Sequence, residues 1–293
     1  MIRNLKVNKL SLILLVYFCL MLLYWVGLQI KGSTDLTINL FYSFSLNTLS
    51  FIGGVLGVFV SFRWGGFRSI LGRGLLLISL GLISWGALGG YVWSYYNFIL
   101  HQEVPYPSLS DVGFIGAVPL WATGMFFLAK ATGVKYGLKN KAGKAYLFFL
   151  PILSLATSYY LLVTVARHGS ITDGGSTLKV FFDFAYPIGD VIIITIALLI
   201  LGLTLKLLGG LYRRPIHILL IGFVAMFFAD MAFSYSTTVE TYYNGNYADL
   251  LFTTALFLIG FGVTSFALKP IEENSSSVVE SVPNNAPSGS DNG

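Results

Sequence analysis

Charged residues and cysteine are both scarce in this sequence. Charged residues make up 11% of the 293 positions, whereas a soluble domain carries about 25%, and this excludes a water-soluble fold of this size. The single cysteine, Cys19, excludes an intramolecular disulfide and a metal site built from several cysteines. Because Cys19 lies inside an apolar stretch, we expect its thiol to be buried and inert.

Motifs for catalysis and cofactor binding are missing as well. The three histidines lie far apart in the sequence. No metal-ligand spacing, nucleophile elbow, Walker loop or dinucleotide loop is present. We therefore predict a protein that is not an enzyme and that has no metal site and no cofactor.

Long apolar runs dominate what the chain does contain. Hydrophobic residues account for 55% of it, and the mean hydropathy is +0.76. A helix needs about 20 apolar residues to cross a bilayer, and eight stretches qualify: 10–30, 39–62, 71–95, 111–130, 145–166, 186–206, 215–237 and 248–268. The sequence predicts an all-α polytopic membrane protein with about eight transmembrane helices in residues 10–268. A basic segment at 1–9 precedes them, and a polar tail at 271–293, expected to be disordered and cytoplasmic, follows.

The basic residues predict the orientation. If the eight stretches alternate in direction, the termini and every second loop share one side, which holds fifteen of the 18 lysines and arginines. The other side keeps only Lys31, Arg167 and Lys179. By the positive-inside rule both termini are cytoplasmic, in a protein of the cell membrane. The net charge of +5 is thus explained by membrane topology. We therefore predict that the protein interacts with the lipid bilayer and does not bind nucleic acid.

The acidic residues ahead of the tail gather on the opposite, outer side. Asp111, Asp190 and Asp249 each mark the start of an even-numbered stretch. Each follows a tyrosine by a few residues, namely Tyr106, Tyr186 and Tyr247. A carboxylate at a helix N-terminus accepts from free backbone N–H groups and opposes the positive dipole end. We therefore expect Asp111 and Asp249 to be helix-capping residues, and Asp190 to lie in the first turn of a helix that begins near Tyr186.

Asp230 lies well inside the seventh stretch. About 14 residues separate it from the cytoplasmic entry, which places it roughly 20 Å into the layer at 1.5 Å per residue. A charge at that depth costs about 2.5 kcal/mol or more, and such a residue is a functional candidate by default. A protonated or internally hydrogen-bonded structural carboxyl is the alternative, with Ser234, four residues on, as the candidate partner.

Further polar and aromatic groups occur at outer or middle depth. Asn47 lies in the second stretch and Trp85 in the third. We predict that Asp230, Asp190, Asn47, Ser234 and Trp85 line an outward-open pocket, provided that their helices converge. Its ligand would be a small or cationic molecule that arrives from the outer side.

The run Tyr106-Pro107-Ser108-Leu109-Ser110-Asp111 resembles a Pro-Ser-x-x-Asp segment of a loosely defined group of prokaryotic multi-pass modules. Those modules often precede diguanylate cyclase or histidine kinase domains and are regarded as sensory. The resemblance covers roughly residues 40–268 and implies a sensory module. In this chain a polar tail stands where an output domain would follow, which implies a stand-alone module that acts through a partner protein.

Three functions fit the sequence. The first is a sensory or ligand-binding membrane module with an acidic and aromatic outer mouth. The second is a cation- or proton-coupled transporter that uses Asp230, although clearly discontinuous helices are missing. The third is a structural or assembly partner of another membrane protein, since glycine-rich helices pack closely.

Overall fold

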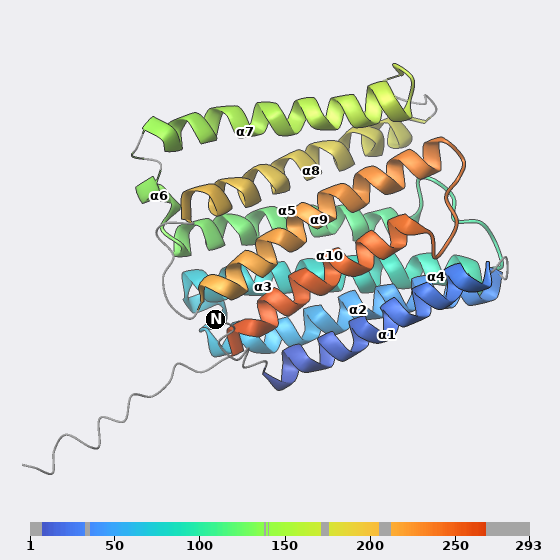
Figure 1. Ribbon diagram of the computed structural model, residues 1–293, viewed down its shortest axis with the longest axis horizontal. Helices are drawn as coiled ribbons and strands as arrows, with labels where there is room; N and C mark the ends of the chain where they lie inside the picture. Colours follow the sequence, from blue (N-terminus) through green and yellow to red (C-terminus); the bar gives the residue numbers. More distant parts are fainter. Residues whose placement is uncertain are drawn as a thin grey trace, which may run out of the picture.

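The structure of the chain, a computed structural model, describes residues 8–32, 36–137, 139, 141–170, 176–204 and 212–267. It is a bundle of long helices that run side by side (Figure 1). The predicted tail at 271–293 and most of the basic segment at 1–9 lie outside these residues, as do Asp35 and Asp173.

Eight helical spans in the described residues are long and apolar enough to cross a membrane. They are α1 (Lys9–Lys31), α2 (Leu36–Arg63), α3 (Ile70–Ile83) continued by η2 (Ser84–Tyr91) and α4 (Val92–Phe98), α5 (Leu109–Ala131), α7 (Lys141–Tyr159) continued by η3 (Tyr160–Ala166), α8 (Thr177–Thr204), α9 (Arg213–Thr238) and α10 (Tyr247–Thr264). Short helices η1 (Gly66–Arg68), α6 (Val134–Gly137) and η4 (Ser265–Ala267) complete the described elements, which include no strand. The prediction of an all-α, multi-pass membrane protein with eight spans is confirmed.

Two details differ from the sequence prediction. Helix α8 begins at Thr177, nine residues before Tyr186. Hydropathy predicted the later start because Lys179 and Asp183 lower the hydropathy of the first turns without ending the helix. Asp190 therefore lies thirteen residues inside α8 and not in its first turn. The expectation of a buried Cys19 is also wrong, since the thiol is exposed on α1, where a bilayer would surround it.

Six of the eight spans form a closed ring. Going round it, α2 packs on α3, α3 with η2 on α5, α5 on α8, α8 on α9, α9 on α10, and α10 on α2 again. The other two spans lie outside the ring, α1 against α2 and α10, and α7 against α8. In Figure 1 these two form opposite edges of the bundle. Sequence order and spatial order thus differ, because the last span closes the ring against the second.

The ring is tightest where α5 crosses the π-helical segment η2. A Cβ on Gly113 would overlap backbone atoms of Leu88 and Gly89. The Ser84 hydroxyl donates a 2.8 Å hydrogen bond to the Gly113 carbonyl oxygen. Small residues permit this close backbone approach, and the crossing fixes the wall of the ring beside the cavity described next.

Candidate functional site

A cavity of about 420 Å³ lies inside the ring. We call the end of the bundle where α5 and α10 begin the acidic end, and the end where α9 begins the basic end. All six ring spans line the cavity, together with residues 104–106 of the loop ahead of α5 and Tyr242 of the loop ahead of α10. Its volume falls within the range of small-molecule sites, about 300–1,000 Å³.

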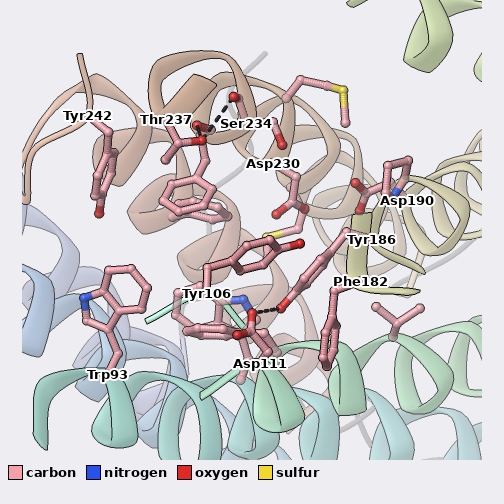
Figure 2. A pocket seen from close by; sticks show the side chains of 18 of the residues that line it. Trp93, Tyr106, Asp111, Phe182, Tyr186, Asp190, Asp230, Ser234, Thr237 and Tyr242 are labelled. Carbon is pink, nitrogen blue, oxygen red and sulfur yellow. Dashed lines mark hydrogen bonds between the residues drawn. The ribbon is translucent and has the colours of Figure 1, made fainter. Parts of the chain in front are cut away.

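Asp190 of α8 and Asp230 of α9 both line this cavity, and Figure 2 shows their carboxyl groups near each other. They come from neighbouring helices, since α8 packs on α9. Two acidic side chains thus meet at one position of the cavity wall. Asp230 lies eight residues from the end of α9 at Thr238, or roughly 12 Å along the helix.

Three further aspartates border the cavity, and each accepts a hydrogen bond from a tyrosine. The bonds join Tyr106 to Asp183 at 3.1 Å, Tyr186 to Asp111 at 2.7 Å and Tyr242 to Asp249 at 3.1 Å. Each bond connects different elements or a loop to a helix, and together they tie the acidic ends of α5, α8 and α10 to their surroundings.

Tyr106 and Tyr242 lie in loops outside the spans. Burial, followed by the negative charge of Asp183, raises the pKa of Tyr106 above its ordinary value. Burial and the charge of Asp249 raise the pKa of Tyr242 in the same way. Both phenols therefore keep their protons at neutral pH and act as hydrogen-bond donors.

Asp111 and Asp249, which the sequence predicted to cap helices, also accept hydrogen bonds from side chains of other elements. Asp111 Oδ2 accepts a 2.7 Å hydrogen bond from the Ser108 backbone N–H in a capping box. Its other oxygen, Oδ1, accepts a hydrogen bond from the Tyr186 hydroxyl. In α10 the N-cap is Asn246. Asp249 accepts from one backbone N–H, that of Gly245, and also from the hydroxyl of Ser43 on α2. Helix capping thus accounts for only part of their hydrogen bonding, and both line the cavity.

The three remaining predicted site residues also line the cavity. Asn47 is buried, and its amide nitrogen donates to the Gly90 carbonyl oxygen at 2.9 Å. Because Gly90 belongs to η2, this bond holds the π-helical segment against α2. Trp85 packs its ring between those of Phe114 and Phe252. Ser234 lies one turn from Asp230 on α9. The ring thus brings together all five predicted residues.

Asp183 and the tyrosines are the site residues that the sequence prediction missed. The Asp183 side chain is only 2% exposed, and its Oδ1 also accepts from Arg167 at 3.4 Å. Tyr106 and Tyr186 enter the sequence pattern only as residues that precede Asp111 and Asp190. The recurrence of tyrosine close to proline and aspartate was a signal that these tyrosines belong to the site. The sequence did not indicate which carboxyl group each phenol bonds.

Towards the basic end the cavity is closed by aromatic rings. Trp121 of α5 and Phe223 of α9 are 2% and 0% exposed, with ring centroids 5.7 Å apart in an edge-to-face arrangement. The Trp121 indole N–H donates to the Ile78 carbonyl oxygen at 3.2 Å. Two aromatic rings from α5 and α9 and the backbone of α3 therefore meet at this depth, and the polar groups of the cavity lie between them and the acidic end.

The chain matches no protein-family model, no curated protein and no solved structure. Within the described residues, no group of three or more histidine, cysteine or acidic side chains is placed to hold a metal ion. The geometry of the cavity therefore carries the functional argument.

Proposed function

We propose that the protein is a ligand-binding membrane module of the sensory kind, and that its cavity takes a small organic cation. The Asp190–Asp230 pair inside an aromatic-lined cavity carries this proposal. An organic ammonium ion there would gain charge-assisted hydrogen bonds and attraction to the faces of the surrounding rings.

Charge supports the same ligand class. Five aspartates and two basic residues line the cavity, namely Asp111, Asp183, Asp190, Asp230, Asp249, Arg167 and Lys179. Acidic side chains thus outnumber basic ones by five to two. A net negative cavity with low-dielectric walls attracts cations and repels anions.

A matched pair of probes tests the proposal. We expect phenethylammonium to bind the purified full chain in detergent micelles at least tenfold more tightly than phenethyl alcohol, which has the same ring and linker without the charge. The difference corresponds to about 1.4 kcal/mol, a modest value for a charge-assisted interaction in a cavity. Isothermal titration calorimetry measures both affinities. Equal affinities, or tighter binding of the alcohol, would show that the cavity does not select cations.

We infer that the acidic end faces outward in the cell membrane and that both termini are cytoplasmic. Basic residues concentrate at the other end of the described spans, including Arg63, Arg68, Arg73, Lys130, Lys139, Lys141, Lys144, Arg213 and Arg214, as positive-inside orientation requires. In this orientation the ligand enters from outside, and a partner protein at the basic end receives the signal.

Cysteine labelling checks this orientation. In a Cys19→Ser background, we expect Glu103→Cys, in the exposed loop ahead of α5, to react with a membrane-impermeant maleimide on intact cells. Lys139→Cys, exposed at the basic end, should react only after the cells are permeabilised. The reverse pattern would place the cavity mouth on the cytoplasmic side.

Proton-coupled transport is a second candidate, favoured by the two neighbouring carboxyl groups of Asp190 and Asp230 inside the bundle. A carboxyl group at this depth can exchange a proton for a cation, which is the exchange that a coupled carrier needs. The aromatic closure at Trp121 and Phe223 would have to open in each transport cycle. The flux measurement that distinguishes this candidate is described below together with the Asp230 variants.

A further inference from the structure

Two basic side chains at the basic end lie on the same aromatic ring. The guanidinium carbon Cζ of Arg73, on α3, lies 5.3 Å from the centroid of the Phe127 ring on α5. The Lys130 ammonium nitrogen, also on α5, lies 5.9 Å from the same centroid and 4.5 Å from that of Phe126. Both head groups are attracted to the ring, and this brings two positive charges close together although they repel each other.

The packing of α3 on α5 fixes this arrangement. A Cβ on Gly74 would lie 3.2 Å from the Gly124 carbonyl oxygen and 3.5 Å from the Phe127 Cβ. Glycine at both positions permits this close approach of the two helices. Because Arg73 adjoins Gly74 in the sequence, the crossing places the arginine beside the Phe127 ring. The Arg73–Lys130 pair thus belongs to a packed wall of the ring of spans and not to a free loop.

The described residues supply no negative charge to this pair. Every acidic side chain among them lies in the cavity wall or in the loops of the acidic end. Arg73 is the fourth residue of α3, near the positive end of the helix dipole, which does not compensate its charge. Its Nε is buried and has no hydrogen-bond partner among the described residues, while the side chain as a whole is partly exposed. The terminal nitrogens are therefore the part of the guanidinium that a ligand can reach.

The surroundings of the pair indicate what kind of ligand reaches it. Ile70 lies three residues before Arg73, and Phe126 lies four residues before Lys130, so each shares a helix face with its basic neighbour. Ile70 is 47% exposed and Phe126 is 51% exposed. Exposed apolar side chains on a membrane span face lipid, and the ends of spans lie at the depth of the headgroups. A ligand at this position meets positive charge and apolar surface side by side.

We propose that the Arg73–Lys130 pair is a binding site for an anionic phospholipid, with the phosphate between the two head groups and an acyl chain along Ile70 and Phe126. Guanidinium and ammonium groups form charge-assisted hydrogen bonds with phosphate oxygens. Basic groups between transmembrane helices on the cytoplasmic side bind acidic lipid headgroups in this manner. The lipid contacts both α3 and α5 and so holds together two spans of the ring. The site is separate from the cavity and does not depend on the ligand proposed there.

Two lipids with the same acyl chains test the proposal. We expect phosphatidylglycerol, which carries one net negative charge, to bind the purified full chain in uncharged detergent micelles at least tenfold more tightly than phosphatidylcholine, which carries none. Native mass spectrometry measures both affinities, and equal affinities would overturn the proposal. Inorganic phosphate at the same concentration should not displace phosphatidylglycerol, because it has no acyl chain. Displacement would assign the pair to a soluble anion and overturn the lipid site.

Variants distinguish this site from the general attraction of the basic end for negative charge. Arg73→Gln/Lys130→Gln should lower the preference for phosphatidylglycerol at least fivefold. Arg213→Gln/Arg214→Gln removes the same charge from exposed positions of α9 at the same end, and it should leave the preference unchanged. Equal losses in the two double variants would mean diffuse electrostatic attraction and would overturn the site.

The single variant Lys130→Gln keeps the test decisive if the Arg73 variant does not fold. Lys130 is exposed near the end of α5, where glutamine can replace it without disturbing the packing of α3 on α5. The preference for phosphatidylglycerol should fall at least threefold, because one of the two groups that hold the phosphate is lost. An unchanged preference in this variant would overturn the shared site.

Discussion

The double variant Asp190→Asn/Asp230→Asn is expected to weaken phenethylammonium binding by a hundredfold or more. It removes the negative charge at the deepest polar position of the cavity while preserving side-chain size and hydrogen bonding. Loss of a buried charge partner typically costs about 2–5 kcal/mol, and about 1.4 kcal/mol corresponds to tenfold. The affinity for phenethyl alcohol should remain unchanged, since that probe carries no charge. Calorimetry on the full chain measures both.

The single variants are expected to lose much less, by less than tenfold each. Replacing one aspartate by asparagine leaves the neighbouring carboxyl group in place to pair with the ammonium ion. Glu103→Gln, which removes a negative charge from an exposed loop outside the cavity, serves as the matched control and should leave binding unchanged. A single variant that weakens binding as much as the double variant would show that the two carboxyl groups cannot substitute for each other.

Asp230→Asn also distinguishes binding from transport. Asparagine cannot release a proton, and proton-driven uptake would stop in this variant even though the cation still binds. The measurement is uptake of radiolabelled phenethylammonium into proteoliposomes under an imposed proton gradient. Gradient-driven flux in the wild type that disappears in Asp230→Asn would support the carrier. Binding without flux in both proteins would support the ligand-binding module.

Gly113→Ala is expected to give the largest loss of stability among single methyl additions. Its new Cβ would overlap backbone atoms of η2, which cannot move away as a flexible side chain can. Overpacking typically costs about 1–3 kcal/mol, and a clash with backbone atoms places this variant at the upper end of that range. Thermal unfolding in detergent micelles, followed by circular dichroism, should show a lower midpoint, and less folded protein should elute from size exclusion.

Gly202→Ala provides the matched control for Gly113→Ala. It makes the same change in α8, where a Cβ would meet no heavy atom within 4 Å. Alanine is also the better helix former by about 1 kcal/mol. The midpoint of this variant should equal or exceed that of the wild type. Equal midpoints for the two variants would mean that the α5–η2 crossing is looser than its geometry indicates.

Hydropathy was sufficient to predict the eight spans because each needs about 20 apolar residues, whatever its neighbours are. The sixth span was the exception. Lys179 and Asp183 interrupt its apolar pattern, and the predicted start at residue 186 therefore fell nine residues late. In the structure both residues line the cavity. Lys179 and Asp183, which made the predicted start of the helix too late, are thus part of the candidate site.

The tyrosine–aspartate pattern shows that a single sequence does not reveal which side chains are hydrogen-bond partners. Asp111 and Asp190 each follow a tyrosine in the sequence, yet Tyr106 bonds Asp183 and Tyr186 bonds Asp111. Each phenol has a partner other than its sequence neighbour, because the packing of helices and loops brings the phenols to the carboxyl groups. The depth of Asp230 made it a candidate on sequence grounds alone. Its pairing with Asp190 depended on the packing of α8 on α9, which the sequence does not specify.

The closed ring has a consequence for how the protein is made. Helix α10 supplies one wall of the cavity and joins α9 to α2, yet of the eight spans it is the last to leave the ribosome. Until it inserts, α2 and α9 have no connection on that side and the cavity remains open to lipid. The cavity is therefore complete only after the eighth of these spans has inserted. A molecule that binds the finished cavity would stabilise the assembled eight-span bundle selectively over its membrane-inserted precursors.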